Sequence, residues 1–234
     1  MPLLRPRHRR SPVRAGRRRQ LGPGGLIRLV PVLVTMLVAT ACAGIPGVYV
    51  VERPGDTGGA PQAFDATTYV DGIWETKVVP TVQSDAVPAT TLLPALAADQ
   101  KKASTTYGKQ SGSGAPYAFL IKGTGTVTEV NDNGAVGSIA VKVPGVKIDV
   151  SLAIGPAFVG TAIRDAVGIG FGEFTNQLDY ADAATALNAR VKTSVVNAVD
   201  PKTIKGHRVT FAGAFSVLDP ESVLVTPVEL TVAP

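Results

Sequence analysis

The chain has 234 residues, which allows one or two domains, and its formal net charge is +5 with a pI near 9.4. The positive charge lies at one end, because residues 1–41 hold nine arginines and no acidic residue. The other 14 basic and 18 acidic residues give residues 42–234 a net charge of −4. This distribution argues against the broad basic surface by which proteins bind nucleic acid.

Cysteine and histidine are scarce in this chain. Cys42 is the single cysteine, so no intrachain disulfide can form. Beyond residue 41 the one histidine is His207, and the chain therefore lacks the Cys and His ligands of a zinc site. We expect no metal and no cofactor. We interpret His207 as a solvated histidine at the entrance to a strand.

Residues 1–41 are interpreted as a basic leader followed by an apolar signal or anchor segment. Leu29–Ala41 is a 13-residue apolar run, which suits a signal peptide and is too short to span a bilayer. The small residues before Cys42 resemble a bacterial lipobox, whose cysteine carries the lipid. The alternative is an uncleaved transmembrane anchor over Leu29–Val51. In both cases the arginines stay cytoplasmic, and the remainder is exported and anchored to the membrane at its N-terminus.

The next two segments are predicted to be a linker and a helical subdomain. Residues 42–63 form the lipidated start and a linker rich in Gly and Pro. Residues 64–115 predict a small helical subdomain with short strands. Its first part, residues 64–82, is interpreted as a short strand or turn pair, with Trp74 as a core anchor.

A helix is then predicted from the Thr90-Thr91 cap to the stop at Gly108. Pro94 is placed in its first turn, where proline is tolerated.

Residues 116–234 predict a β-barrel domain. Apolar residues alternate with polar ones over 119–128, 139–143 and 146–154, which indicates three antiparallel strands with one buried face. Gly123 and Gly125 fall on inward positions of the first strand and suit the tight bends of a small barrel.

A long helix over about 176–199 and a closing pair of strands complete the domain. The expected apolar stripe of the helix comprises Leu178, Ala181, Ala184, Leu187, Val191 and Val195. In the last strand Leu224, Val228, Leu230 and Val232 are expected to share one face. The fold class is therefore α+β: a small helical N-terminal subdomain plus an OB-like antiparallel β-barrel with a long helix between strands 3 and 4.

Several short motifs stand out, and they include Lys122–Gly125, Ile154–Pro156, Gly160–Asp165, Phe174–Gln177 and Thr226-Pro227. In these motifs the chain resembles one family, the predicted periplasmic lipoproteins of domain of unknown function 2291. The resemblance runs from about Phe64 to the C-terminus. It implies an exported lipoprotein with a helical and a β-rich part, whose genes often neighbour those of ABC-type sugar transporters. It implies no catalytic residues.

The crossover from the third strand to the long helix contains the candidate recognition loop. Gly155, Pro156 and Gly160 are interpreted as structural residues of this crossover. A dinucleotide fingerprint is excluded, because Gly168 and Gly170 lack the third glycine and the neighbouring strands are antiparallel.

Arg164 and Asp165 have two interpretations. In the first, Arg164 bridges the loop to the barrel and Asp165 caps backbone N–H groups. In the second, Arg164 presents a planar fork to a carboxylate, a sugar hydroxyl or a partner protein. Asn176 and Gln177 could then add hydrogen bonds to the same ligand.

The expected function is that of a non-enzymatic, membrane-anchored lipoprotein that serves as an accessory or binding component of ABC-type sugar uptake. Its expected partners are the membrane, a transporter and a sugar. One alternative is an envelope saccharide hydrolase that uses carboxylates such as Asp165 and Glu173. The other is a purely structural envelope protein.

Overall fold

The computed structural model describes residues 63–132, 134–217 and 222–233. The leader, Cys42 and nearly all of the linker lie outside the described residues. Residues 60–234 form one compact unit. The helical elements are α2 (Ala66–Ile73), the π-helix η1 (Trp74–Val78), α3 (Val79–Asp85), α4 (Ala89–Ala98), α5 (Gln100–Tyr107), α6 (Ala162–Ala166), the 3-10 turn η2 (Phe171–Glu173), α7 (Gln177–Ser194) and the 3-10 turn η3 (Val196–Ala198). The strands are β1 (Val87–Pro88), β2 (Ala118–Asn131), β3 (Val136–Lys142), β4 (Asp149–Pro156), β5 (Arg208–Ser216) and β6 (Ser222–Val232).

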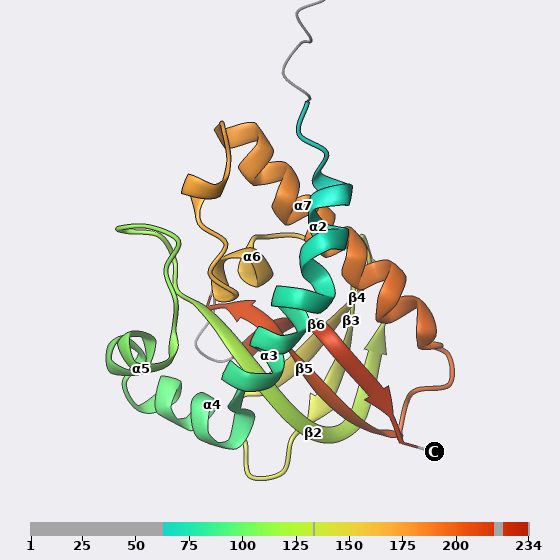
Figure 1. The fold of residues 1–234 in the computed structure, drawn as a ribbon. Helices are drawn as coiled ribbons and strands as arrows, with labels where there is room; N and C mark the ends of the chain where they lie inside the picture. The colour runs from blue at the N-terminus through green and yellow to red at the C-terminus, as the bar shows by residue number, and fades with distance from the viewer. Residues whose placement is uncertain (1–62, 133, 218–221, 234) are drawn as a thin grey trace, which may run out of the picture. The chain divides into compact units, whose positions relative to one another are not determined.

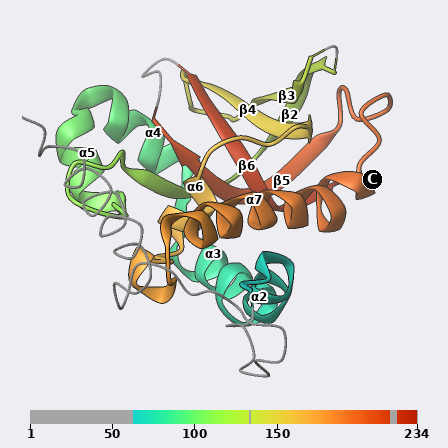
Figure 2. The same ribbon diagram turned by 90° about the horizontal axis from the view of Figure 1, so that it is seen from above.

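Strands β2 to β6 form a closed barrel (Figure 1). The sheet order is β1-β2-β3-β4-β6-β5, and an additional pairing between β2 and β5 closes the ring. All barrel pairs are antiparallel except β4 with β6, and the short β1 adds a parallel pair at the edge of β2. Helix α7 connects β4 to β5 and lies along the barrel (Figure 2). The predicted OB-like barrel with a long helix between its third and fourth strands is confirmed.

Two glycines of β2 lie where neighbouring groups come very close. A Cβ atom added at Gly125 would lie 2.6 Å from the Lys142 carbonyl oxygen. At Gly123 it would lie 3.0 Å from the Phe211 ring. Any larger residue at Gly125 would therefore push β2 and β3 apart, as expected for a bend in a small barrel.

The helices and the barrel share one hydrophobic core. Its largest fully buried side chains include Leu92, Phe119, Ile163, Leu187, Phe211 and Phe215. Trp74 is also buried, which confirms its predicted role as a core anchor. The core thus joins the elements of residues 64–115 to those of the barrel.

The short strand or turn pair predicted over residues 64–82 is wrong, because this segment is helical through α2, η1 and α3. The β-branched Thr and Val residues favoured a strand. Two other signals indicate a helix. The first is the cap of α2, where the Asp65 side chain accepts hydrogen bonds from the Thr67 and Thr68 N–H groups. In addition, Val70, Trp74, Val78 and Val82 recur every four residues and are all buried.

The single helix predicted from Thr90 to Gly108 is two helices. Asp99 ends α4 and caps α5, because its side chain accepts from the Lys102 N–H at 2.9 Å. Pro94 lies inside α4 rather than in its first turn.

The predicted stripe of α7 is correct from Ala184 onward and wrong in the first turns. Leu178 is 68% exposed and Ala181 is exposed, whereas Tyr180 and Ala183 are buried. The buried Tyr180 ring packs against Phe174, at a centroid distance of 5.4 Å. Tyr180, an aromatic residue with a polar hydroxyl, thus takes the buried position that hydropathy predicted for Leu178.

The face that Leu224 was predicted to share with Val228 is also wrong, since Leu224 is 41% exposed and Val228 is buried. The register of β5 and β6 shifts between Ala212 and Gly213, which leaves Val228 as an extra residue in β6. Such a bulge changes the face on which the following residues lie. Val223 and Val225 are therefore buried before the bulge, and Val228 is buried at it.

Candidate functional site

A pocket of about 390 Å³ opens beside α6, where the crossover after β4 faces the adjoining ends of β5 and β6. Its volume is within the range of small-molecule sites. The lining residues are Pro116, Val159, Gly160, Thr161, Ala162, Asp165, Ser216, Ser222, Leu224 and Thr226. Aliphatic groups, hydroxyls and a single carboxylate therefore surround this space.

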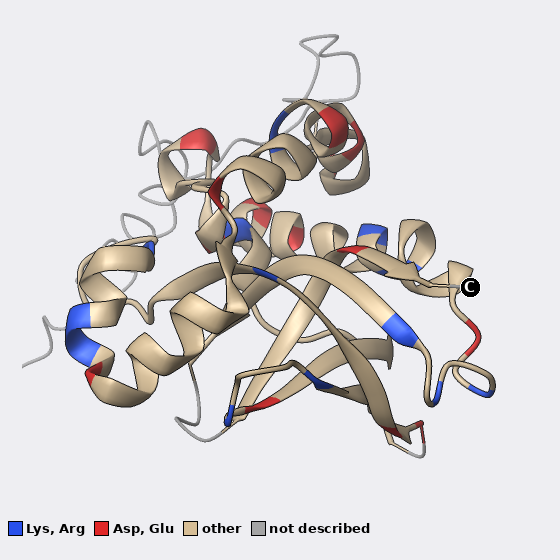
Figure 3. Cartoon of the chain, turned by 90° about the horizontal axis from the view of Figure 1, so that it is seen from below, with Lys and Arg blue, Asp and Glu red and all other residues tan. Residues whose placement is uncertain are grey.

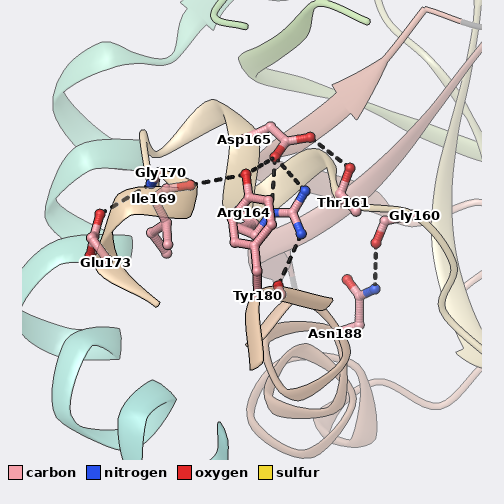
Figure 4. Close-up of polar contacts among 9 residues, drawn as sticks. All are labelled: Gly160, Thr161, Arg164, Asp165, Ile169, Gly170, Glu173, Tyr180 and Asn188. Atoms are coloured by element: carbon pink, nitrogen blue, oxygen red, sulfur yellow. Dashed lines mark hydrogen bonds and ion pairs between the residues drawn. The ribbon is translucent and has the colours of Figure 1, made fainter. Parts of the chain in front are cut away.

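Asp165 is held by several side chains at once (Figure 4). Arg164 and Asp165 are each only 7% exposed. The Asp165 carboxylate accepts from Arg164 Nε at 3.0 Å, and Arg164 Nη2 lies 2.9 Å from the same oxygen, Oδ1. The other oxygen, Oδ2, accepts from the Thr161 hydroxyl at 2.6 Å. The predicted capping of backbone N–H groups by Asp165 is thus replaced by these side-chain contacts.

Arg164 connects the crossover to α7 and not to the barrel. Its Nη1 donates to the Tyr180 carbonyl oxygen at 3.0 Å, and its guanidinium carbon lies 3.5 Å from the centre of the Tyr180 ring. The Tyr180 hydroxyl lies 3.4 Å from both Asp165 Oδ1 and the Ile169 carbonyl oxygen. Arg164 therefore forms a bridge as expected, but its partner is α7 rather than the barrel.

Two hydroxyls of the pocket have no hydrogen-bond partner in the part of the chain that the structure describes. Thr226 on β6 is only 7% exposed, and Ser216 ends the neighbouring strand β5. A hydroxyl can both donate and accept a hydrogen bond, so these two groups are available to a bound molecule.

Asn176 and Gln177 are exposed, and neither lines the pocket. Asn176 caps α7: its Oδ1 accepts from the Asp179 N–H at 2.9 Å. Gln177 is the first residue of the helix. The structure therefore does not bring these two side chains to the pocket beside Asp165.

The crossover begins with Gly155, which is buried, has a φ of +77° and precedes a cis peptide bond to Pro156. Gly160 also has a positive φ, of +92°, and lines the pocket. Its carbonyl oxygen accepts from Asn188 Nδ2 of α7 at 3.0 Å, which ties this wall of the pocket to the helix.

Glu173 belongs to a second polar cluster, which does not line the pocket. It accepts from the Tyr69 hydroxyl at 3.0 Å, from Lys77 at 3.3 Å and from the Gly170 N–H at 3.1 Å. Burial opposes ionisation of this carboxyl, but the hydrogen bonds outweigh burial and lower the pKa of Glu173. Burial, with the neighbouring Glu173 carboxylate, raises the pKa of Tyr69 well above its usual range.

The described residues hold few other candidate groups. His207 is exposed, as expected from the sequence. Residues 63–132, 134–217 and 222–233 contain no group of three or more metal-ligating side chains, and no helix among them is long and apolar enough to cross a membrane. Figure 3 shows Lys and Arg scattered over helices, strands and loops rather than gathered in one stripe.

Sequence reasoning missed the hydroxyl residues of the pocket, namely Thr161, Ser216 and Thr226. Thr161 and Thr226 do lie in motifs that carry the family resemblance, Gly160–Asp165 and Thr226-Pro227. No sequence feature marks Ser216 as a pocket residue, because serine is common where a strand meets a surface loop.

Comparisons with known proteins agree with the fold. A solved structure of an OB-fold protein from Thermotoga maritima is similar to this chain, with a TM-score of 0.62 and 24% sequence identity. The match covers 74% of this chain and all of the other. No curated protein matches. The model of the family described as predicted periplasmic lipoprotein (DUF2291) matches residues 34–231. The chain therefore belongs to this family of predicted periplasmic lipoproteins, whose members are exported and membrane-anchored.

Proposed function

We propose that this lipoprotein is a non-enzymatic binding or accessory component of ABC-type sugar uptake. In this proposal a lipid on Cys42 holds it at the outer face of the cytoplasmic membrane, and the pocket beside Asp165 holds its small-molecule ligand. The family resemblance supports the link to a transporter, and the pocket supports the binding role.

The observation that carries the proposal is the hydroxyl of Thr226, a residue that is only 7% exposed. It lines a space large enough for a small molecule and has no protein partner among the described residues. A ligand hydroxyl that pairs with it gains a hydrogen bond, which contributes about 0.5–1.5 kcal/mol.

The position of the pocket adds an argument by analogy. In OB-folds the loop between the last two strands takes part in binding oligonucleotides or oligosaccharides. Here the residues flanking that loop, Ser216 and Ser222, line the pocket. Among the described residues that line it, the pocket has no Lys or Arg and one carboxylate, which favours a saccharide over a nucleic acid.

Hydrolysis of saccharides is less well supported. Most glycosidases use two carboxyl groups on either side of the scissile bond. Among the described lining residues Asp165 is the one carboxylate. It already forms an ion pair with Arg164 and accepts a hydrogen bond from Thr161. Glu173 is held in its own cluster by Tyr69 and Lys77.

The test uses the full-length protein purified in detergent. We expect its melting temperature to rise with at least one neutral sugar of a broad panel, and a transporter subunit to be recovered with it from membranes. If no sugar shifts the melting temperature and no transporter subunit is recovered, the proposal fails. An activity on saccharides that Asp165→Asn and Glu173→Gln both abolish would instead favour the hydrolase.

A further inference from the structure

We infer that the pocket selects a neutral molecule that carries hydroxyl groups, and that the pairing of Arg164 with Asp165 is the device that excludes charged ligands. The inference rests on the proposed function, because it names the class of molecule that the pocket would hold.

Anions are disfavoured because the pocket offers them no cation. Asp165 is the one charged residue among the described residues that line it. Arg164 is not among the lining residues, and its three contacts are directed to Asp165 and to the Tyr180 carbonyl. A carboxylate or phosphate in this space would lose its hydration, meet the Asp165 carboxylate and find no compensating charge.

Cations are disfavoured by the same ion pair. The Asp165 charge is already balanced by Arg164, whose Nε and Nη2 both approach Oδ1 within 3.0 Å. An ammonium group placed at Asp165 would add a second positive charge close to this buried guanidinium. Since both are positive, the repulsion offsets much of the attraction to the carboxylate.

Neutral hydroxyls match the groups that remain. Asp165 Oδ2 accepts from Thr161 and retains a lone pair that can accept another hydrogen bond. The Thr226 and Ser216 hydroxyls can each donate or accept, and neither has a partner within the described chain. A ligand hydroxyl also does both. The exposed side chains of Val159 and Leu224 give the same space an aliphatic wall for the carbon skeleton of the ligand.

The experiment measures binding of matched probes to the full-length protein in detergent by calorimetry. The neutral probes are glucose, xylose and xylitol, the anionic probes are glucuronate and glucose 6-phosphate, and the cationic probe is glucosamine. We expect a neutral probe to bind at least about tenfold more tightly than its anionic and cationic counterparts. In Arg164→Gln the preference for glucose over glucosamine should fall about tenfold or reverse.

The outcomes separate this inference from the proposed function. If glucuronate, glucose 6-phosphate or glucosamine binds as tightly as glucose, the charge exclusion is wrong although the pocket binds sugars. If no probe binds, the proposed function fails and this inference fails with it. If Arg164→Gln does not fold, the comparison of probes on the unmodified protein still tests whether charged ligands are excluded.

Discussion

The guanidinium carbon of Arg164 lies 3.5 Å from the centre of the Tyr180 ring. Arg164 also donates to the backbone carbonyl of Tyr180, so the short helix α6 is fixed to α7 by two contacts with one residue. Asp165, the next residue, consequently has a fixed position in the pocket wall. In this adjacent pair, Arg164 thus holds α6 to α7, and Asp165 lines the candidate site.

Arg164→Ala should destabilise the protein strongly. Removing one partner of a buried ion pair leaves the other charge unpaired, which costs about 3–5 kcal/mol. The loss can be measured as a decrease in the free energy of unfolding in urea. Arg164→Lys is the matched control, because it keeps the charge and loses the forked contacts, and it should recover part of the loss. Wild-type stability in Arg164→Ala combined with lost ligand binding would show instead that Arg164 is a recognition residue.

Glu173 should support stability only above acidic pH. Its pKa is lowered in the folded protein, so its contribution is present above the ordinary value of 4.5 and is lost as the pH falls through the lowered pKa. The side chain is 42% exposed, which limits the effect to less than about 1 kcal/mol. The decrease in stability below pH 4.5 should be smaller in Glu173→Gln, whereas the exposed control Glu75→Gln should behave like the wild type. Identical acid profiles for all three would contradict this account.

Tyr69 should limit stability at alkaline pH. Burial, together with the neighbouring Glu173 carboxylate, raises its pKa in the folded protein. The unfolded chain therefore releases this proton first, and stability falls as the pH rises above about 10. In Tyr69→Phe the decrease between pH 9 and 11, followed as the midpoint of urea unfolding, should be smaller. An unchanged alkaline profile would show that the pKa of Tyr69 is ordinary.

The barrel could be predicted from the sequence because its strands follow the two-residue period of a half-buried sheet. The two-residue period does not predict where the bulges lie. The extra residue at Val228 turns Leu224 outward to the pocket, and no local pattern around Leu224 signals this. Strand pairing depends on contacts distant in sequence, and a shift of one residue exchanges the two faces.

The candidate site was only partly accessible to prediction. Asp165 was singled out from its place in a glycine-rich crossover, and it does line the pocket. The sequence allows Asn176 either at a ligand or at the N-cap of the long helix, and in the structure it is the N-cap. Thr226 was missed because a threonine in a strand is unremarkable until its hydroxyl is seen without a partner.

Anchoring through Cys42 can be tested by metabolic labelling with a fatty acid. We expect the wild type to be labelled and Cys42→Ser to lose the label, because the thiol is the attachment point of the lipid in a lipoprotein. A transmembrane anchor would leave both proteins unlabelled but membrane-bound. Equal labelling of the two proteins would show that lipid is attached elsewhere.

The central claim is that the pocket lined by Thr226 binds the ligand, and the most direct measurement compares Thr226→Val with Thr231→Val. Thr231 lies exposed on the same strand and does not line the pocket, so it is the matched control. Replacing the unpartnered Thr226 hydroxyl by a methyl group should change the free energy of unfolding by less than about 1 kcal/mol. It should also weaken binding of a neutral sugar about tenfold, while Thr231→Val leaves binding unchanged. Equal sugar affinity in both variants and the wild type would contradict the account.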